Sequence, residues 1–179
     1  NGTPPTEPYG LSKWRAEQGL HEVFADRGLS VIIIRPTLVY GPGVKGNLQV
    51  LHRSIRRGLP RPPGGGERSM IALDDLVELL QQVVAHAPDG LHTWIACGDK
   101  DYSTQAVYDL MREAQGLEQG RGWLPDWTWQ LGTVVMDVFA RRPLGTTRAQ
   151  LFCSERYTNG AARAALDWVP SHSFEQLAR

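Results

Sequence analysis

The chain has 179 residues, of which 41% are hydrophobic and 21% are charged, and its 19 basic residues balance its 19 acidic residues. This length and composition predict a folded domain and exclude an intrinsically disordered chain. The balanced charge gives no sign of electrostatic capture by nucleic acid or by a membrane surface, so we expect no nucleic-acid partner.

The cysteines and the start of the chain bear on its compartment. Cys97 and Cys153 lie far apart and lack the spacing of a disulfide framework or a zinc site, so two buried free thiols in a reducing compartment are predicted. No apolar run approaches the ~20 residues of a membrane span, and the first residues are not a signal peptide. We therefore expect a cytoplasmic protein. Because the chain begins at Asn1 in loop-like sequence, we also expect it to be a fragment.

The first predicted elements are a helix and a buried strand. Pro8 suits a first helical turn, and a helix is expected from Tyr9 to Arg27 with Gly28 as its cap. Its apolar face would contain Ala16, Leu20, Val23 and Phe24. Residues 29–36, "LSVIIIRP", predict a strand buried on both faces of a parallel sheet. A helix that leads into such a strand is half of a βαβ unit.

A glycine-rich loop, "TLVYGPGVKG", is predicted after this strand, at the sheet edge where open α/β folds bind ligands. Asn47 is then expected to cap a helix that ends near Arg57. Residues 61–73 predict a turn-rich connection with a short extended segment.

The rest of the chain predicts helices and short strands in alternation, without an internal repeat. In chain order we expect a helix capped by Asp74 or Asp75 and ending at His86, a buried strand at 92–98, a helix from Thr104 to Gln115 capped by Ser103, a helix from Asp126 to Arg141, a short helix capped by Thr158 or Asn159 and ending at Leu166, and a last helix opened by Ser173. This order predicts the α/β class.

Tyr9 and Lys13 are the candidate catalytic pair. Residues four apart share a helix face, so the ammonium group can lie beside the phenol. A free tyrosine, with a pKa near ~10, is a poor base at neutral pH, and a neighbouring cation favours the phenolate. Such a pair can move the proton of a secondary alcohol while a nicotinamide cofactor takes the hydride. On the pair alone, an ordinary exposed helix face is the favoured interpretation.

Three motifs in order make the pair specific. They are "PYGLSK" at 8–13, "RPTLVYGPG" at 35–43 and "RSMIALDDLV" at 68–77, and the closing "LDWVP" follows at 166–170. Together they resemble the extended short-chain dehydrogenase/reductases, in particular the NAD-dependent nucleotide-sugar epimerase/dehydratase family and its bacterial UDP-sugar 4-epimerases. The resemblance covers nearly the whole chain and is weakest at 116–151.

The resemblance implies roles for three residues around the cofactor, NAD. Tyr9 would be the catalytic acid/base, and Lys13 would tune it and hydrogen-bond the nicotinamide ribose. Pro36 would lie against the nicotinamide end.

The resemblance also implies a UDP-sugar site. Asn47 and Leu48 match the segment that meets the nucleotide, although Asn47 is equally compatible with a plain helix cap. Arg68 matches the arginine that grips the diphosphate, because a guanidinium fork suits phosphate oxygens. The family often has asparagine where this chain has Leu38, which puts a direct sugar contact there in doubt.

Other candidates are weaker. Arg148 and Arg156 are possible second diphosphate contacts, with solvated surface favoured. The five histidines show no metal-ligand spacing, so we assign them no role and expect no metal. The tryptophans Trp123, Trp127 and Trp129 could contact a lipid-linked substrate or a membrane, but a packed helix or a dimer contact is favoured.

The family's cofactor-binding turn, Gly-x-x-Gly-x-x-Gly after a strand, does not occur in this sequence. The resemblance therefore implies the C-terminal part of a Rossmann-type parallel sheet with a small mixed α/β substrate-binding lobe. Residues 1–45 would belong to the dinucleotide-binding domain and 46–179 mainly to the lobe, with sheet elements returning at about 70–97.

The function expected is part of an NAD-dependent UDP-sugar 4-epimerase, in a full-length protein that is a homodimer. A nucleotide-sugar 4,6-dehydratase or a 4-keto reductase would use the same Tyr9 and Lys13. A non-catalytic nucleotide-binding relative and an inactive fragment are the remaining alternatives.

Overall fold

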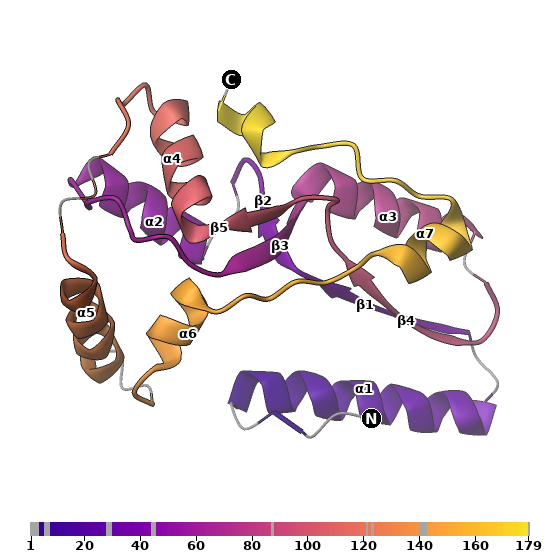
Figure 1. Cartoon of the computed structure of the whole chain (residues 1–179). Coiled ribbons are helices and arrows are strands. Elements are labelled where there is room, and N and C mark those ends of the chain that lie inside the picture. The colour runs from indigo at the N-terminus through magenta and orange to yellow at the C-terminus, as the bar shows by residue number, and fades with distance from the viewer. Residues whose placement is uncertain are drawn as a thin grey trace.

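A computed structural model describes residues 4–5, 8–27, 30–43, 46–86, 88–120, 122, 124–139 and 143–178. Helices surround a small, mostly parallel sheet (Figure 1), which confirms the predicted α/β class. The elements are α1 (Pro8–Arg27), β1 (Val31–Pro36), β2 (Leu38–Tyr40), α2 (Asn47–Arg56), β3 (Glu67–Ala72), α3 (Leu73–His86), β4 (Leu91–Ala96), β5 (Asp101–Ser103), α4 (Thr104–Ala114), α5 (Asp126–Phe139), α6 (Thr146–Phe152), α7 (Gly160–Leu166) and the 3-10 helix η1 (Phe174–Ala178).

The strands form two small sheets, one of two strands and one of three, that meet at the end of β1. β1 runs parallel to β4, whereas β2 runs parallel to β3, and β5 lies antiparallel on the other side of β3. The Thr37 N–H donates to the Ala96 carbonyl at 3.0 Å, and the Gly98 N–H donates to the Met70 carbonyl at 2.7 Å. These two hydrogen bonds join the sheets where they meet.

β3 separates the two hydrophobic cores. Because side chains alternate along a strand, Met70 and Ala72 face one cluster while Ile71 faces the other. The first cluster is completed by Tyr40, Tyr102, Val107 and Phe174, and the second by Leu79, Trp94, Ala96, Ala162 and Trp168. The closing "LDWVP" motif thus contributes its tryptophan, Trp168, to the second core, where it is fully buried.

Helix α1 forms where it was predicted, but its predicted apolar face is not buried. Leu20 and Val23 are exposed and Phe24 is only partly covered, whereas Leu11, Trp14 and Glu17 are among the partly covered residues earlier in the helix. β1 is also less enclosed than predicted, since only Ile33 is fully buried and the strand pairs with β4 alone among the described residues. The positions Gly28, Leu29, Trp123 and Arg141 lie outside the described residues.

Several local predictions were wrong. Leu38–Tyr40 forms a strand rather than loop, and the short strand β5 and helix α6 were not predicted. The N-cap of α2 is Gly46, whose φ of 105° suits glycine, and Asn47 is the first helical residue. Ser173 leads into a short 3-10 helix. Cys97 is buried, which raises its pKa to about 11, but Cys153 is exposed.

The predicted caps Asp74 and Asp75 lie inside the first turn of α3, which begins at Leu73. Other helix starts agree better: Ser103 accepts a hydrogen bond from the Ala106 N–H at 3.1 Å and caps α4 as predicted. Asn159 occupies the N-cap position of α7, but its side chain donates instead to the Cys97 carbonyl at 2.9 Å.

Asp75 fastens the C-terminal segment to α3. Its fully buried carboxylate accepts hydrogen bonds from the backbone N–H groups of Ser171 and His172, each at 3.1 Å. It also accepts from the Ser171 hydroxyl at 3.3 Å and contacts the His172 Nδ1 at 2.6 Å. The hydrogen bond from Asp75 raises the pKa of His172 above its usual 6.5, with smaller contributions from Asp74 and Glu78.

None of the helices among the described residues is long and apolar enough to cross a membrane.

The pair of His172 and Asp75 predicts a pH-dependent stability. A raised pKa in the folded state means that protonated His172 stabilises the fold fully below pH ~6.5 and loses this effect as the pH rises through the folded-state pKa. In urea unfolding, wild type should exceed His172→Gln in free energy of unfolding by more at about pH 6 than at about pH 9. Because the imidazole is nearly half exposed, this difference should change by less than about 1 kcal/mol.

The control is His86→Gln, which removes an exposed histidine at the end of α3, the helix that contains Asp75. A difference between wild type and His172→Gln that grows with pH would contradict the assignment.

Candidate active site

Tyr9 and Lys13 lie together at the start of α1. The Lys13 ammonium is 5.5 Å from the centre of the Tyr9 ring, as expected for residues four apart on a helix. The Tyr9 side chain is 75% exposed, so its phenol is accessible to a ligand. The Ser12 hydroxyl donates to the Tyr9 carbonyl at 2.7 Å and ties the first turn together. The structure therefore brings a phenol and a cation to one accessible position.

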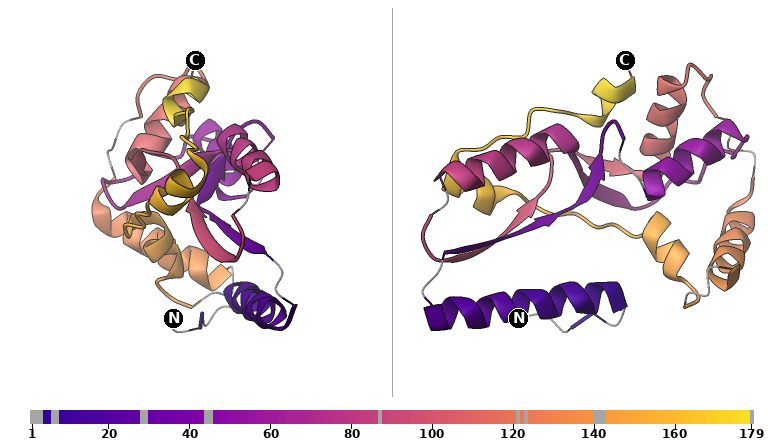
Figure 2. Two further views of the ribbon diagram at one scale, coloured as in Figure 1. Left: turned by 90° about the vertical axis from the view of Figure 1, so that its right-hand side faces the viewer. Right: turned by 180° about the vertical axis from the view of Figure 1, so that it is seen from behind.

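The start of α1 lies toward the edge of the sheet at which β1 ends. α1 runs opposite to β1, so its first turn lies toward the carboxyl end of that strand (Figures 1 and 2). Arg35, next to last in β1, grips Glu17 of α1 with two nitrogens; its Nε donates to one carboxylate oxygen at 2.9 Å. The hydrogen bond from Arg35 lowers the pKa of Glu17 and raises that of Arg35. This ion pair joins the middle of α1 to the end of β1.

Pro36 closes β1 at the same edge. It is exposed and pairs with Ala96 across the parallel ladder. The following Thr37 donates both its N–H and its hydroxyl to the Ala96 carbonyl, at 3.0 and 3.1 Å. The backbone after Pro36 is thus held rigidly while the proline ring remains accessible.

Arg68 lies on β3, beside α6. One terminal nitrogen donates to the Ala149 carbonyl at 3.3 Å, and the other lies 3.6 Å from the Glu155 carboxylate. The side chain is only 19% exposed, and its buried Nε has no hydrogen-bond partner among the described residues. A guanidinium that is covered but incompletely satisfied can gain hydrogen bonds from an anion.

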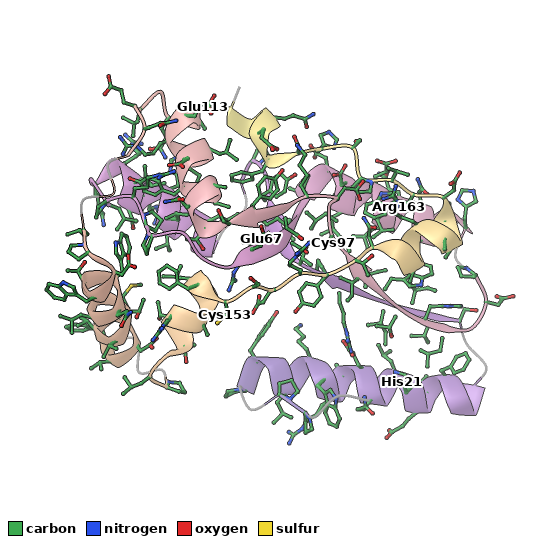
Figure 3. The ribbon with its side chains drawn as sticks, in the orientation of Figure 1. His21, Glu67, Cys97, Glu113, Cys153 and Arg163 are labelled. Atoms are coloured by element: carbon green, nitrogen blue, oxygen red, sulfur yellow. The ribbon has the colours of Figure 1, made fainter. Side chains whose placement is uncertain are left out.

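The segment after α6 lies alongside the start of β3. Gly66 donates its N–H to the Phe152 carbonyl at 2.9 Å, and Glu155 donates to the Glu67 carbonyl at 2.8 Å. Figure 3 shows Glu67 and Cys153 from these two segments near one another, with α1 below. The segment that follows α6 is thus held against the start of β3.

The other predicted ligand residues are less clearly placed. Asn47 begins α2, but its side chain lies outside the described residues. Leu48 is partly buried against the core and lines a cavity of about 350 Å³ between α2, α4 and η1. Arg148 is exposed on α6, and Arg156 is exposed but donates to Asp101 at 2.8 Å.

Sequence reasoning missed the ion pair between Arg35 and Glu17. The two residues are 18 positions apart in different elements, and only the arginine belongs to a recognised motif. It also missed that Arg68 would contact α6, because α6 itself was not predicted.

Comparison with known proteins gives a consistent family match. The model of the "NAD dependent epimerase/dehydratase family" matches residues 1–96. A UDP-glucose 4-epimerase from Vibrio cholerae is 36% identical over 131 residues, covering 71% of this chain and 37% of that protein. An N-acetyl-α-D-glucosaminyl-diphospho-ditrans,octacis-undecaprenol 4-epimerase from Escherichia coli O157:H7 is 24% identical over 159 residues, covering 84% and 48%. The chain thus spans less than half of these relatives.

Solved structures support the same fold. A UDP-glucuronic acid 4-epimerase from Bacillus cereus in complex with NAD has a TM-score of 0.72 at 15% identity, covering 97% of this chain and 50% of that one. A UDP-glucose 4-epimerase from Thermotoga maritima with UDP-glucose has a TM-score of 0.69 at 20% identity, covering 97% and 52%. These likenesses confirm the predicted Rossmann-type sheet.

Loss of the ion pair between Arg35 and Glu17 is predicted to make α1 more mobile. Arg35→Gln removes the two charged hydrogen bonds to Glu17 and should cost about 0.5–1 kcal/mol, because the pair is partly exposed. Hydrogen exchange of the α1 amides should become several-fold faster, while that of β3 amides stays unchanged. Arg15→Gln, an exposed arginine on the same helix, is the control. Equal exchange in Arg35→Gln and wild type would show that other contacts hold α1.

Proposed function

Because the chain belongs to the NAD-dependent epimerase/dehydratase family, we propose that its protein is a nucleotide-sugar 4-epimerase with Tyr9 as the catalytic acid/base. The predicted cofactor, NAD, is that of the family. The observation that carries the proposal is the exposed Tyr9 phenol with the Lys13 ammonium 5.5 Å from its ring, at the carboxyl end of the sheet.

Tyr9 would move one proton in each direction. Bound NAD supplies the acceptor and donor of hydride for the sugar carbon. As a phenolate, Tyr9 accepts the proton of the 4-hydroxyl while the C4–H bond breaks and a 4-keto sugar forms. After the keto sugar turns in the site, Tyr9 returns the proton to the oxygen as the C–H bond reforms on the other face. Lys13 would keep its ammonium beside the Tyr9 ring during this cycle.

The residues present fit the nicotinamide end of the cofactor. An accessible phenol and a neighbouring ammonium offer the donors that ribose hydroxyls can use, and exposed Pro36 closes the adjoining strand. The glycine-rich turn that would hold the pyrophosphate does not occur in this sequence. Lys13, Tyr9 and Pro36 would thus contact only one end of NAD.

Arg68 would bind the diphosphate of the substrate. Its covered guanidinium has one unsatisfied nitrogen, and the opposing Glu155 is half exposed, which allows an anion to replace it. Asn47 and Leu48 would meet the nucleotide of a UDP-sugar. In this proposal residues 1–45 belong to the dinucleotide-binding domain and 46–179 mainly to a substrate lobe, with sheet elements at about 70–97.

Related reactions use the same pair. A dTDP-glucose 4,6-dehydratase from Bacillus anthracis in complex with NAD has a TM-score of 0.66 to this chain, so a 4,6-dehydratase or a 4-keto reductase is the alternative chemistry. A non-catalytic relative is disfavoured by the presence of both Tyr9 and Lys13. A homodimer and a cytoplasmic location stay predictions from the sequence.

A second substrate class is favoured by α5, which exposes a row of large apolar side chains. The Escherichia coli relative is named for a sugar carried on a diphospho-undecaprenol lipid rather than on a nucleotide. Both classes of substrate join a sugar to a diphosphate, so Tyr9 and Arg68 would have the same roles in each.

Tyr9→Phe should abolish most turnover in the full-length natural protein assayed with UDP-glucose. Loss of the hydroxyl removes the group that accepts and returns the proton, so kcat should fall roughly 10²–10⁴-fold with little change in KM. Tyr157→Phe removes the hydroxyl of another exposed tyrosine and serves as the matched control. Equal turnover by Tyr9→Phe and wild type would remove Tyr9 from the mechanism.

Arg68→Lys should weaken UDP binding, measured by calorimetry on the same full-length protein. A lysine keeps the charge but loses the planar fork, so we expect affinity to fall about tenfold. Arg156→Lys is the matched control and should change affinity less than about twofold, because Arg156 is exposed and already paired with Asp101. Similar losses in both variants would contradict a specific role for Arg68.

A further inference from the structure

One face of α1 carries three polar side chains in a row. Tyr9, Lys13 and Glu17 follow one another at intervals of four residues, and residues so spaced are neighbours on a helix surface. The face therefore presents a phenol, an ammonium and a carboxylate in that order. The ammonium stands between two groups that can each attract it.

The Lys13 ammonium lies with the phenol and not with the carboxylate. Its nitrogen is 5.5 Å from the centre of the Tyr9 ring. Within the part of the chain that the structure describes, Lys13 forms no ion pair with Glu17 or with any other carboxylate. A lysine and a glutamate four residues apart on a helix normally attract one another, so their separation needs a cause.

Arg35, at the end of β1, supplies that cause. Its Nε donates to one oxygen of the Glu17 carboxylate at 2.9 Å, and a terminal nitrogen donates to the other oxygen. The planar guanidinium matches the two oxygens of a carboxylate, which a single ammonium cannot do. Both oxygens are thus engaged, and the charge of Glu17 is compensated without Lys13.

Glu17 would need another cation if Arg35 were absent. Its side chain is only 17% exposed, and a covered carboxylate without a cation is costly. Lys13 lies one turn before Glu17 on α1, and His21 lies one turn after it and already acts on its charge. At pH 8 an ordinary histidine is neutral, which leaves Lys13 as the cation on this helix face.

We propose that Arg35 is a positioning residue that holds the Glu17 carboxylate and thereby leaves the Lys13 ammonium beside Tyr9. This inference rests on the acid/base role of Tyr9 in the proposed function. Arg35 acts through Glu17 and Lys13 and does not itself touch the sugar. Without Arg35, the Glu17 carboxylate draws the ammonium along the helix and away from the phenol.

A rescue experiment on the full-length natural protein tests the proposal, with UDP-glucose as the substrate at pH 8. In Arg35→Gln, kcat should fall about threefold to fivefold, the shift in population that one partly covered ion pair produces. Adding Glu17→Gln removes the competing carboxylate, so the double variant should recover to within about twofold of wild type. Arg15→Gln, which changes an exposed arginine on the same helix, is the matched control and should turn over as wild type.

Hydrogen exchange separates this role from a merely structural one. The ion pair to α1 is absent from both Arg35→Gln and the double variant, so the α1 amides should exchange several-fold faster in both. The β3 amides should exchange as in wild type, which establishes that both variants are folded. A structural role alone predicts the same low kcat in both variants, whereas the proposal predicts equal exchange with different kcat.

Two outcomes overturn the proposal. One is a wild-type kcat in Arg35→Gln, and the other is a double variant that turns over as slowly as Arg35→Gln. If Arg35→Gln does not fold, Arg35→Lys takes its place, because one ammonium covers the carboxylate less completely than the fork does. Its kcat should fall about twofold and recover on addition of Glu17→Gln, and absence of that recovery counts equally against the proposal.

Tyr9→Phe distinguishes failure of this inference from failure of the acid/base assignment. Unchanged turnover in Tyr9→Phe would remove the assignment and the inference together. Loss of turnover in Tyr9→Phe without rescue of Arg35→Gln by Glu17→Gln would remove the inference alone.

Discussion

The two-sided burial of β3 is the constraint on which the rest of the structure depends. Ser69, Met70, Ile71 and Ala72 are each at most 5% exposed, so this strand must be covered on both faces. Its edges are also occupied, by parallel β2 on one side and by antiparallel β5 on the other. Helices α3 and α7 cover one face of β3, and α4 with η1 covers the other. The fold is therefore organised around the six residues of β3.

The candidate site uses elements that this strand holds in place. Arg68 is the second residue of β3, and its position is fixed by the pairing opposite Tyr102. Tyr9 and Lys13 are connected to β3 less directly. They lie on α1, which is joined to β1 by the ion pair between Arg35 and Glu17. The phosphate-binding candidate is therefore part of the core framework, whereas the candidate acid/base pair lies on a helix that is attached mainly at the surface. That difference predicts more mobility for Tyr9 than for Arg68.

The sequence predicted those elements that are stabilised by residues close to them in the chain. Ser103 caps α4 through its own side chain, and the apolar run at 91–96 forms the buried strand β4. β2 and β5 have three residues each, which is too short for an apolar period, and they are strands only because β3 pairs with them. Asp75 was predicted as a cap because its real partners, Ser171 and His172, follow nearly a hundred positions later. Long-range polar contacts leave no mark in local sequence.

The candidate site shows the same difference between features with a local sequence signal and features that depend on long-range contacts. Tyr9, Lys13 and Arg68 could be proposed because each belongs to a short motif with a fixed spacing. The burial of polar rather than apolar residues on α5 could not be predicted, since it depends on Asp137 reaching Gly145 and Thr147 beyond the end of the helix. The apolar residues of α5 alone predicted a packed helix, because burial is their usual state.

A crystal structure of the full-length natural protein with NAD and a UDP-sugar tests the central claim most directly. The account predicts the Tyr9 phenolic oxygen within about 3.2 Å of the 4-oxygen of the sugar and the Arg68 guanidinium at hydrogen-bond distance from the diphosphate of the same molecule. A sugar nucleotide bound with its 4-oxygen away from Tyr9, or with its diphosphate held by residues other than Arg68, would contradict the account.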